Sequence, residues 1–115
     1  MNGKGLGFMY DDFSDRLMIT CKGKRNAEVV AGSARFMNLT LDFDSSNKVV
    51  GAEIRGISKM LDSLEIDSDI LNNLIGAELI FRQVRGGYLI YFLLKSKDRV
   101  ERVPFNVPVN KAILH

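Results

Sequence analysis

Acidic side chains gather at two places in this chain of 115 residues. Asp11, Asp12 and Asp15 form one group, and Asp42 and Asp44 form the other. If adjacent hairpins bring both groups to one end of a sheet, the carboxylates could share a proton or bind a divalent metal. The competing interpretation is that each Asp caps its own turn, which is a common role of this residue. We favour turn caps, because nothing in the sequence indicates the burial that acid–base chemistry requires.

The segment from Asp42 to Glu53 nearly reproduces the spacing of an EF-hand calcium loop. With Asp42 at the first position, Asp44 falls at the third, Ser46 at the fifth and Glu53 at the twelfth. The flanking patterns are those of strands, whereas an EF-hand requires helices. We therefore interpret the segment as a hairpin turn, keep Asp42, Asp44 and Glu53 as the metal candidates, and predict no cofactor.

The chain holds one Cys, Cys21, and one His, His115. A single Cys excludes an internal disulfide. One Cys and one His cannot supply a four-ligand zinc site, a Ser-His-Asp triad or a Cys-His centre within one chain. Because these common catalytic centres are excluded, we assign no catalytic residue and expect a binding protein rather than an enzyme.

Charge is divided unevenly along the second half of the chain. Residues 59–78 contain five acidic residues and one basic residue, whereas residues 79–115 contain seven basic and two acidic residues. Basic side chains with Tyr88 and Tyr91 as stacking platforms could bind nucleic acid. The alternative is a solvated face whose Lys and Arg protect sheet edges from pairing. Without a nucleic-acid-binding motif, nucleic acid remains an alternative partner.

These residues must be positioned by elements that the hydrophobic pattern predicts. Apolar residues alternate with polar ones through the first half, which indicates antiparallel strands. The expected strands lie at residues 8–10, 16–21, 28–31, 36–43 and 49–54. The period then changes to that of a helix near Ile57, which Ser58 could begin. The apolar stripe of this short helix consists of Ile57, Met60, Leu61 and Leu64.

A second helical turn is expected to start at Asp67, with Gly76 just after its end. Its apolar face would consist of Ile70, Leu71, Leu74 and Ile75. Strands at residues 77–85 and 88–95 then flank Gly86-Gly87, a strong hairpin signal. A last strand at residues 99–104 is expected at a sheet edge, because Pro104 and Pro108 cannot donate backbone hydrogen bonds.

The predicted fold is therefore α+β and mainly antiparallel, with two β-meanders joined by a short helical segment. A chain of 12.9 kDa suits a single domain over residues 1–115. Within it we place the first meander at residues 8–57, the helical connection at 58–75 and the second meander at 77–105.

Two motifs in the first half suggest a family. Residues 10–19 follow the pattern Y-D-x-x-x-D-x-L-x-I, and residues 42–54 follow D-x-D-x-x-x-x-V-V-G-x-E-I, with Ser58-Lys59 after them. In this order the motifs resemble a family of small prokaryotic domains of unknown function, the one numbered twenty-two eighty-three. The resemblance implies a compact β-hairpin module without an established activity. It does not extend beyond Asp62, and some members look like partners in toxin–antitoxin style gene pairs.

The strand at residues 88–95 is apolar on both of its faces. Tyr88, Ile90, Phe92 and Leu94 share one face, and Leu89, Tyr91 and Leu93 share the other. Soluble monomers seldom expose a large apolar patch, so both sets need a cover. The short helices could supply it. Alternatively, a second subunit covers Leu89, Tyr91 and Leu93, and we predict a homodimer on this basis.

The sequence also indicates a compartment. No apolar run reaches the roughly 18 residues of a membrane span, and the first residues lack the apolar segment of an export signal. An unpaired Cys is typical of a reducing cytoplasm. The predicted function is that of a small cytoplasmic protein-binding or oligomerising module. The alternatives are nucleic-acid binding through the second meander and a divalent-metal site at the Asp-rich turns.

Overall fold

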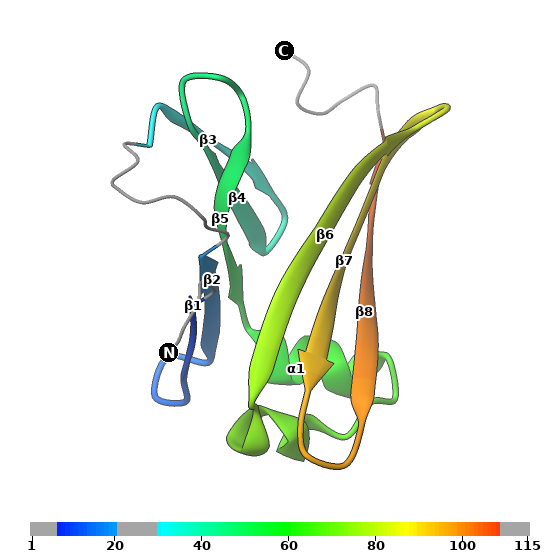
Figure 1. Ribbon diagram of the computed structural model, residues 1–115. Helices are drawn as coiled ribbons and strands as arrows, with labels where there is room; N and C mark the ends of the chain where they lie inside the picture. Colours follow the sequence, from blue (N-terminus) through cyan, green and yellow to red (C-terminus); the bar gives the residue numbers. More distant parts are fainter. Residues whose placement is uncertain (1–6, 21–29, 109–115) are drawn as a thin grey trace.

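The computed structural model describes residues 7–20 and 30–108, and it confirms the predicted α+β fold (Figure 1). Two antiparallel sheets are joined by a short helical segment, as the hydrophobic pattern indicates. Cys21, His115 and residues 28 and 29 of an expected strand lie outside the described residues.

The first sheet contains five strands in the order β1-β2-β5-β4-β3. Their bounds are β1 (Gly7–Asp11), β2 (Arg16–Thr20), β3 (Gly32–Phe36), β4 (Leu39–Phe43) and β5 (Val49–Arg55). β5 lies in the centre, between β2 and β4, so the strands do not follow one another in simple order. Alternation decides which face is buried, because Leu17 and Ile19 of β2 enter the core while Arg16 and Met18 do not.

The prediction of one strand over residues 36–43 is wrong. The chain instead reverses at Met37 and Asn38, so that Phe36 ends β3 and Leu39 begins β4. Met37 adopts a positive φ of 54° there, and its side chain is exposed. The alternation continued through this segment because a two-residue turn does not interrupt a period of two.

The helical segment consists of α1 (Ile57–Ser63) and a short 3-10 helix, η2 (Ser68–Asn73). α1 begins one residue before the expected Ser58, and Gly56, with φ 68°, occupies its N-cap position. Asp67 caps η2 as predicted, and its side chain accepts a hydrogen bond from the Asp69 amide. Two expectations for this segment are wrong, because Ile75 is exposed and Gly76 begins a strand.

The second sheet contains three long strands in the order β6-β7-β8. They are β6 (Gly76–Val84), β7 (Gly87–Lys95) and β8 (Val100–Pro108). The hairpin between β6 and β7 is confirmed, but it turns at Arg85-Gly86 instead of Gly86-Gly87, with Gly86 at φ 90°. β8 is an edge strand, as Pro104 and Pro108 predict.

One hydrophobic core joins both sheets and the helical segment. β6 runs beside β1 and β2, and the helices lie at the end of the sheets away from the β6–β7 turn (Figure 1). In the second sheet, the ring of Phe92 meets that of Phe105 edge to face, with 5.6 Å between centroids. The buried core residues are Leu17, Ile19, Leu39, Leu41, Ala52, Ile54, Ile57, Leu61, Ile70, Leu71, Ala77, Ile90, Phe92, Leu94 and Val103.

Candidate functional site

The second sheet presents one face to the core and one away from it. We call the second one the outer face. Cross-strand register and alternation assign to it the side chains of Glu78, Ile80, Arg82, Val84, Leu89, Tyr91, Leu93, Lys95, Val100, Arg102 and Pro104. The predicted interface residues Leu89, Tyr91 and Leu93 lie on β7, the central strand of this face. The outer face is therefore our candidate interaction site.

The helices do not cover the outer face. Ile57 and Leu61 of α1 and Ile70 and Leu71 of η2 join the core together with the alternate residues of β7, such as Phe92. On the outer face, Val84 is 47% exposed, Leu89 42% and Val100 58%. The sequence left two possible covers for this face, the short helices or a second subunit. The described helices pack on the opposite side of β7, so they do not cover the outer face.

Charged side chains frame the apolar residues of this face. The guanidinium of Arg102 lies over the ring of Tyr91, with 4.7 Å from its central carbon to the ring centroid. Lys95 Nζ is 3.0 Å from Glu78 Oε2. These charged side chains stay accessible to solvent. They lie around the apolar middle of the face, which resembles the apolar centre and polar rim of protein interfaces.

Sequence reasoning missed the residues that β6 and β8 contribute, chiefly Ile80, Val84 and Val100. Their neighbours across the strands are Tyr91, Gly87 and Lys95. The signal that could have found them is the pairing across the hairpin, which depends on the exact turn residues. Placing the turn one residue too late would pair Tyr91 with Arg82 instead of Ile80.

The two Asp-rich turns do not come together. The turn that contains Asp11 and Asp15 lies where β2 starts, beside Arg55 at the end of β5. The turn that contains Asp44 lies at the opposite end, where β5 starts at Val49. The idea that adjacent hairpins unite these carboxylates is therefore wrong, because β2 and β5 run in opposite directions, which puts the start of β2 at the end of β5.

Asp15 instead links the first hairpin to α1. Its carboxylate accepts hydrogen bonds from Tyr10 Oη at 2.8 Å, Ser58 Oγ at 2.8 Å and the Ser58 amide at 3.1 Å. Its backbone carbonyl accepts the Gly56 amide at 2.8 Å. Because α1 has no capping side chain of its own, Asp15 caps it from 43 residues away.

This network changes the proton affinity of both of its acids. Burial raises the pKa of the Asp15 carboxyl, but the hydrogen bonds from Tyr10 and Ser58 outweigh burial and lower it overall. Burial, followed by the hydrogen bond to Asp15, raises the pKa of Tyr10 to about 12. The pair is therefore ionised Asp15 with neutral Tyr10 over a wide range of pH.

The metal candidates have separate structural partners. Asp42 accepts a hydrogen bond from Ser33 Oγ at 2.7 Å, and Asp44 accepts the amides of Ser46 and Lys48 within its own turn. Glu53 Oε2 lies 2.7 Å from Arg16 Nη1. Among the described residues, no three His, Cys, Asp or Glu side chains lie close enough together to hold a metal ion.

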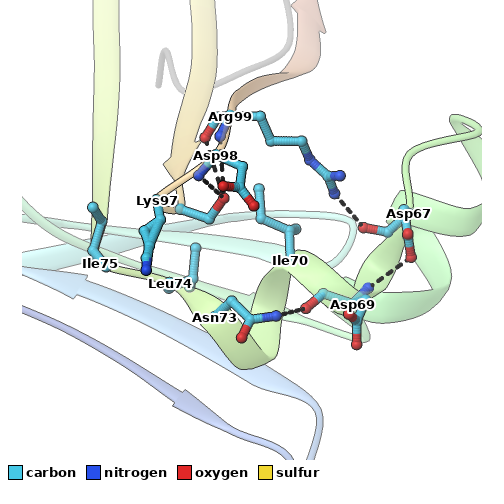
Figure 2. Close-up of a pocket in the computed structure, with 10 residues that line it drawn as sticks. Asp67, Asp69, Ile70, Asn73, Leu74, Ile75, Lys97, Asp98 and Arg99 are labelled. Atoms are coloured by element: carbon cyan, nitrogen blue, oxygen red, sulfur yellow. Dashed lines mark hydrogen bonds between the residues drawn. The ribbon is translucent and has the colours of Figure 1, made fainter.

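A polar pocket of about 570 Å³ lies between η2 and the β7–β8 turn (Figure 2). Arg99 reaches across it and donates to the Asp67 carbonyl at 3.3 Å, while Ser96 Oγ accepts the Asp98 and Arg99 amides. The charges of its walls are mixed, with Asp67, Asp69, Lys97, Asp98 and Arg99 around it. The hydrogen bond from Arg99 thus joins the β7–β8 turn to η2, and the walls of the pocket carry charges of both signs.

Comparisons with known proteins were made for the whole chain. No protein-family model matches it, and neither does any curated protein or solved structure. The resemblance carried by the motifs at residues 10–19 and 42–54 therefore stays a prediction. Within the part of the chain that the structure describes, no helix is long and apolar enough to cross a membrane.

Proposed function

We propose that this protein is a small self-associating, protein-binding module that works through the outer face of β6-β7-β8. The observation that carries the proposal is the exposure of Val84, Leu89 and Val100 on the same sheet face as Tyr91. An apolar patch framed by polar residues is a typical mark of an interaction site. A second copy of the chain is the partner that we propose first, because two-fold dimers are the commonest assemblies.

The carboxylates of the Asp-rich turns have structural partners, which favours a binding module over an enzyme that uses these carboxylates. Asp11, Asp15, Asp42 and Asp44 each accept hydrogen bonds that hold a turn or join two elements. We further propose a cytoplasmic location, supported by a single Cys that suits a reducing compartment. The motif resemblance to small prokaryotic domains agrees with a compact binding module.

Light scattering coupled to size exclusion tests the proposal over a series of micromolar concentrations. We expect the mass to rise above the 12.9 kDa of one chain as concentration increases. Leu89→Glu and Tyr91→Glu should each yield a folded monomer. The matched control is Met9→Glu on the first sheet, since Met9 is 57% exposed but lies outside this face. A constant single-chain mass for the unmodified protein would refute self-association.

Nucleic acid is the second candidate, and one observation favours it. Among the described residues, exposed Arg82, Arg85 and Arg102 form no ion pair, and the guanidinium of Arg102 lies over the ring of Tyr91. Arginines of this kind can bind phosphates. A gel-shift titration against a mixed-sequence duplex and a single strand would then show affinity that falls steeply as salt increases.

A further inference from the structure

Cross-strand register divides the outer face into rows that run across all three strands. The middle row joins Ile80, Tyr91 and Pro104, and two further rows lie on each side of it along β7. Tyr91 is therefore central both along the strands and across them. A two-fold axis at Tyr91 would let each copy cover the whole outer face of the other.

The charges on β6 are arranged around this centre. Glu78 lies one row to one side of Ile80, and Arg82 lies one row to the other side. An axis that crosses the strands would stack β6 on β6 of the second copy with its direction reversed. Each Glu78 would then face Arg82 of the other copy, which gives two ion pairs of opposite charge.

The other simple axis runs along β7 and stacks β6 of one copy on β8 of the other. It too gives two opposite-charge pairs, because each Glu78 would face Arg102 of the other copy. It would place Lys95 of one copy against Lys95 of the other, because both lie on the axis itself. Like charges in direct opposition disfavour a complex. With the axis across the strands, Lys95 instead faces the position of Gly87, which has no side chain. Both axes give two opposite-charge pairs, and the position of Lys95 decides in favour of the axis across the strands.

The size of the face sets the strength of association. Three strands of nine residues span roughly 14 Å by 30 Å, or about 400 Å² of sheet, from standard strand spacings. A standard stable interface covers about 800 Å² on each partner. The outer face thus offers about half the area per partner of a standard interface. Dimerisation should therefore be weak and reversible at micromolar concentrations.

We propose that two copies stack their outer faces about a two-fold axis that crosses the strands at Tyr91, with Glu78 of each copy against Arg82 of the other. This geometry rests on the self-association proposed above. It identifies the partner as a second copy of this chain and names the charge pairs that align the two sheets.

Charge reversal in two separate variants tests the geometry. Glu78→Arg puts Arg against Arg82, and Arg82→Glu puts Glu against Glu78, so each variant alone should dimerise roughly tenfold more weakly. Mixing the two variants restores both opposite-charge pairs. Native mass spectrometry of the mixture should show mixed dimers well above the statistical proportion. The matched control mixes Glu78→Arg with Arg102→Glu, and it should show no such excess, because the proposed axis does not oppose these positions.

Each outcome has a definite meaning. If the unmodified chain dimerises but the first mixture shows only the statistical proportion, the geometry is wrong while self-association stands. An excess of mixed dimers in the control would select the axis along β7 and overturn the proposed one. If the unmodified chain stays monomeric throughout the concentration series, both proposals fail.

Discussion

Removing the carboxylate of Asp15 should weaken the connection between the first hairpin and α1. Asp15→Ala deletes the acceptor of three hydrogen bonds, from Tyr10 Oη, Ser58 Oγ and the Ser58 amide. A hydrogen bond to a charged group contributes about 1.5–3 kcal/mol when buried, and a lost helix cap costs about 1 kcal/mol. Because Asp15 is only half-buried, we take about 1 kcal/mol for each of the two side-chain hydrogen bonds and for the cap, and expect a loss of about 3 kcal/mol.

Asp15→Asn should cost less, about 1 kcal/mol, because Asn caps helices well and tolerates the positive φ of 57° at this position. Urea unfolding measures both changes. With a slope of about 2 kcal/mol per molar, the midpoint should fall by about 1.5 M for Ala and about 0.5 M for Asn. The matched control is Asp12→Ala in the same turn, since Asp12 is exposed and forms none of these hydrogen bonds.

The dependence on pH gives an independent check. The folded protein lowers the pKa of Asp15, so its stabilising effect is present above the unfolded pKa of about 3.9. This effect is lost as pH falls through the lower folded value. Asp15→Asn should therefore flatten the decline of stability in acid. If Asp15→Ala were no more harmful than Asp12→Ala, the proposed capping of α1 by Asp15 would be refuted.

Three further perturbations test other parts of the structure. The unmodified protein should lose stability between pH 10 and about 12, because the folded state keeps Tyr10 neutral there while the unfolded state ionises it. Tyr10→Phe should lack this loss, and urea midpoints of both proteins across this range check it. Gly86→Val should lower stability by about 2 kcal/mol through its φ of 90° alone, whereas Gly32→Val, equally uncrowded but without positive φ, should not; thermal unfolding compares them. Glu53→Gln should cost under about 1 kcal/mol through its pair with Arg16 and leave any calcium response of the melting temperature unchanged.

Local pattern was sufficient to predict most strands, because burial follows alternation directly. β2 and β7 each place alternate residues in the core, as Ile19 and Phe92 illustrate. The same rule failed at Met37, since a tight turn of two residues leaves the period intact. Alternation reports which side of a strand is apolar, but it does not report where the chain reverses.

The candidate interaction site depended on information that alternation lacks. Leu89, Tyr91 and Leu93 were predicted from one strand, and the structure places them together on the outer face. The residues beside them follow from register, which a shift of one residue in the turn changes by two positions. Hence Ile80, rather than Arg82, lies next to Tyr91, and the charges at Glu78 and Arg82 become symmetric around it.

The Asp15 network gives a physical reason for the first sequence motif. Tyr10 and Asp15 face each other across the hairpin turn, and Ser58 meets them from the start of α1. No local signal joins residues that lie 43 positions apart, so the sequence could suggest only a turn cap or a carboxylate cluster. These motif residues connect the hairpin to the helix, whose buried Ile57 and Leu61 join the same core as Phe92 of β7. The motif half therefore packs on the side of the second sheet opposite the outer face, and within the described residues neither helix covers that outer face.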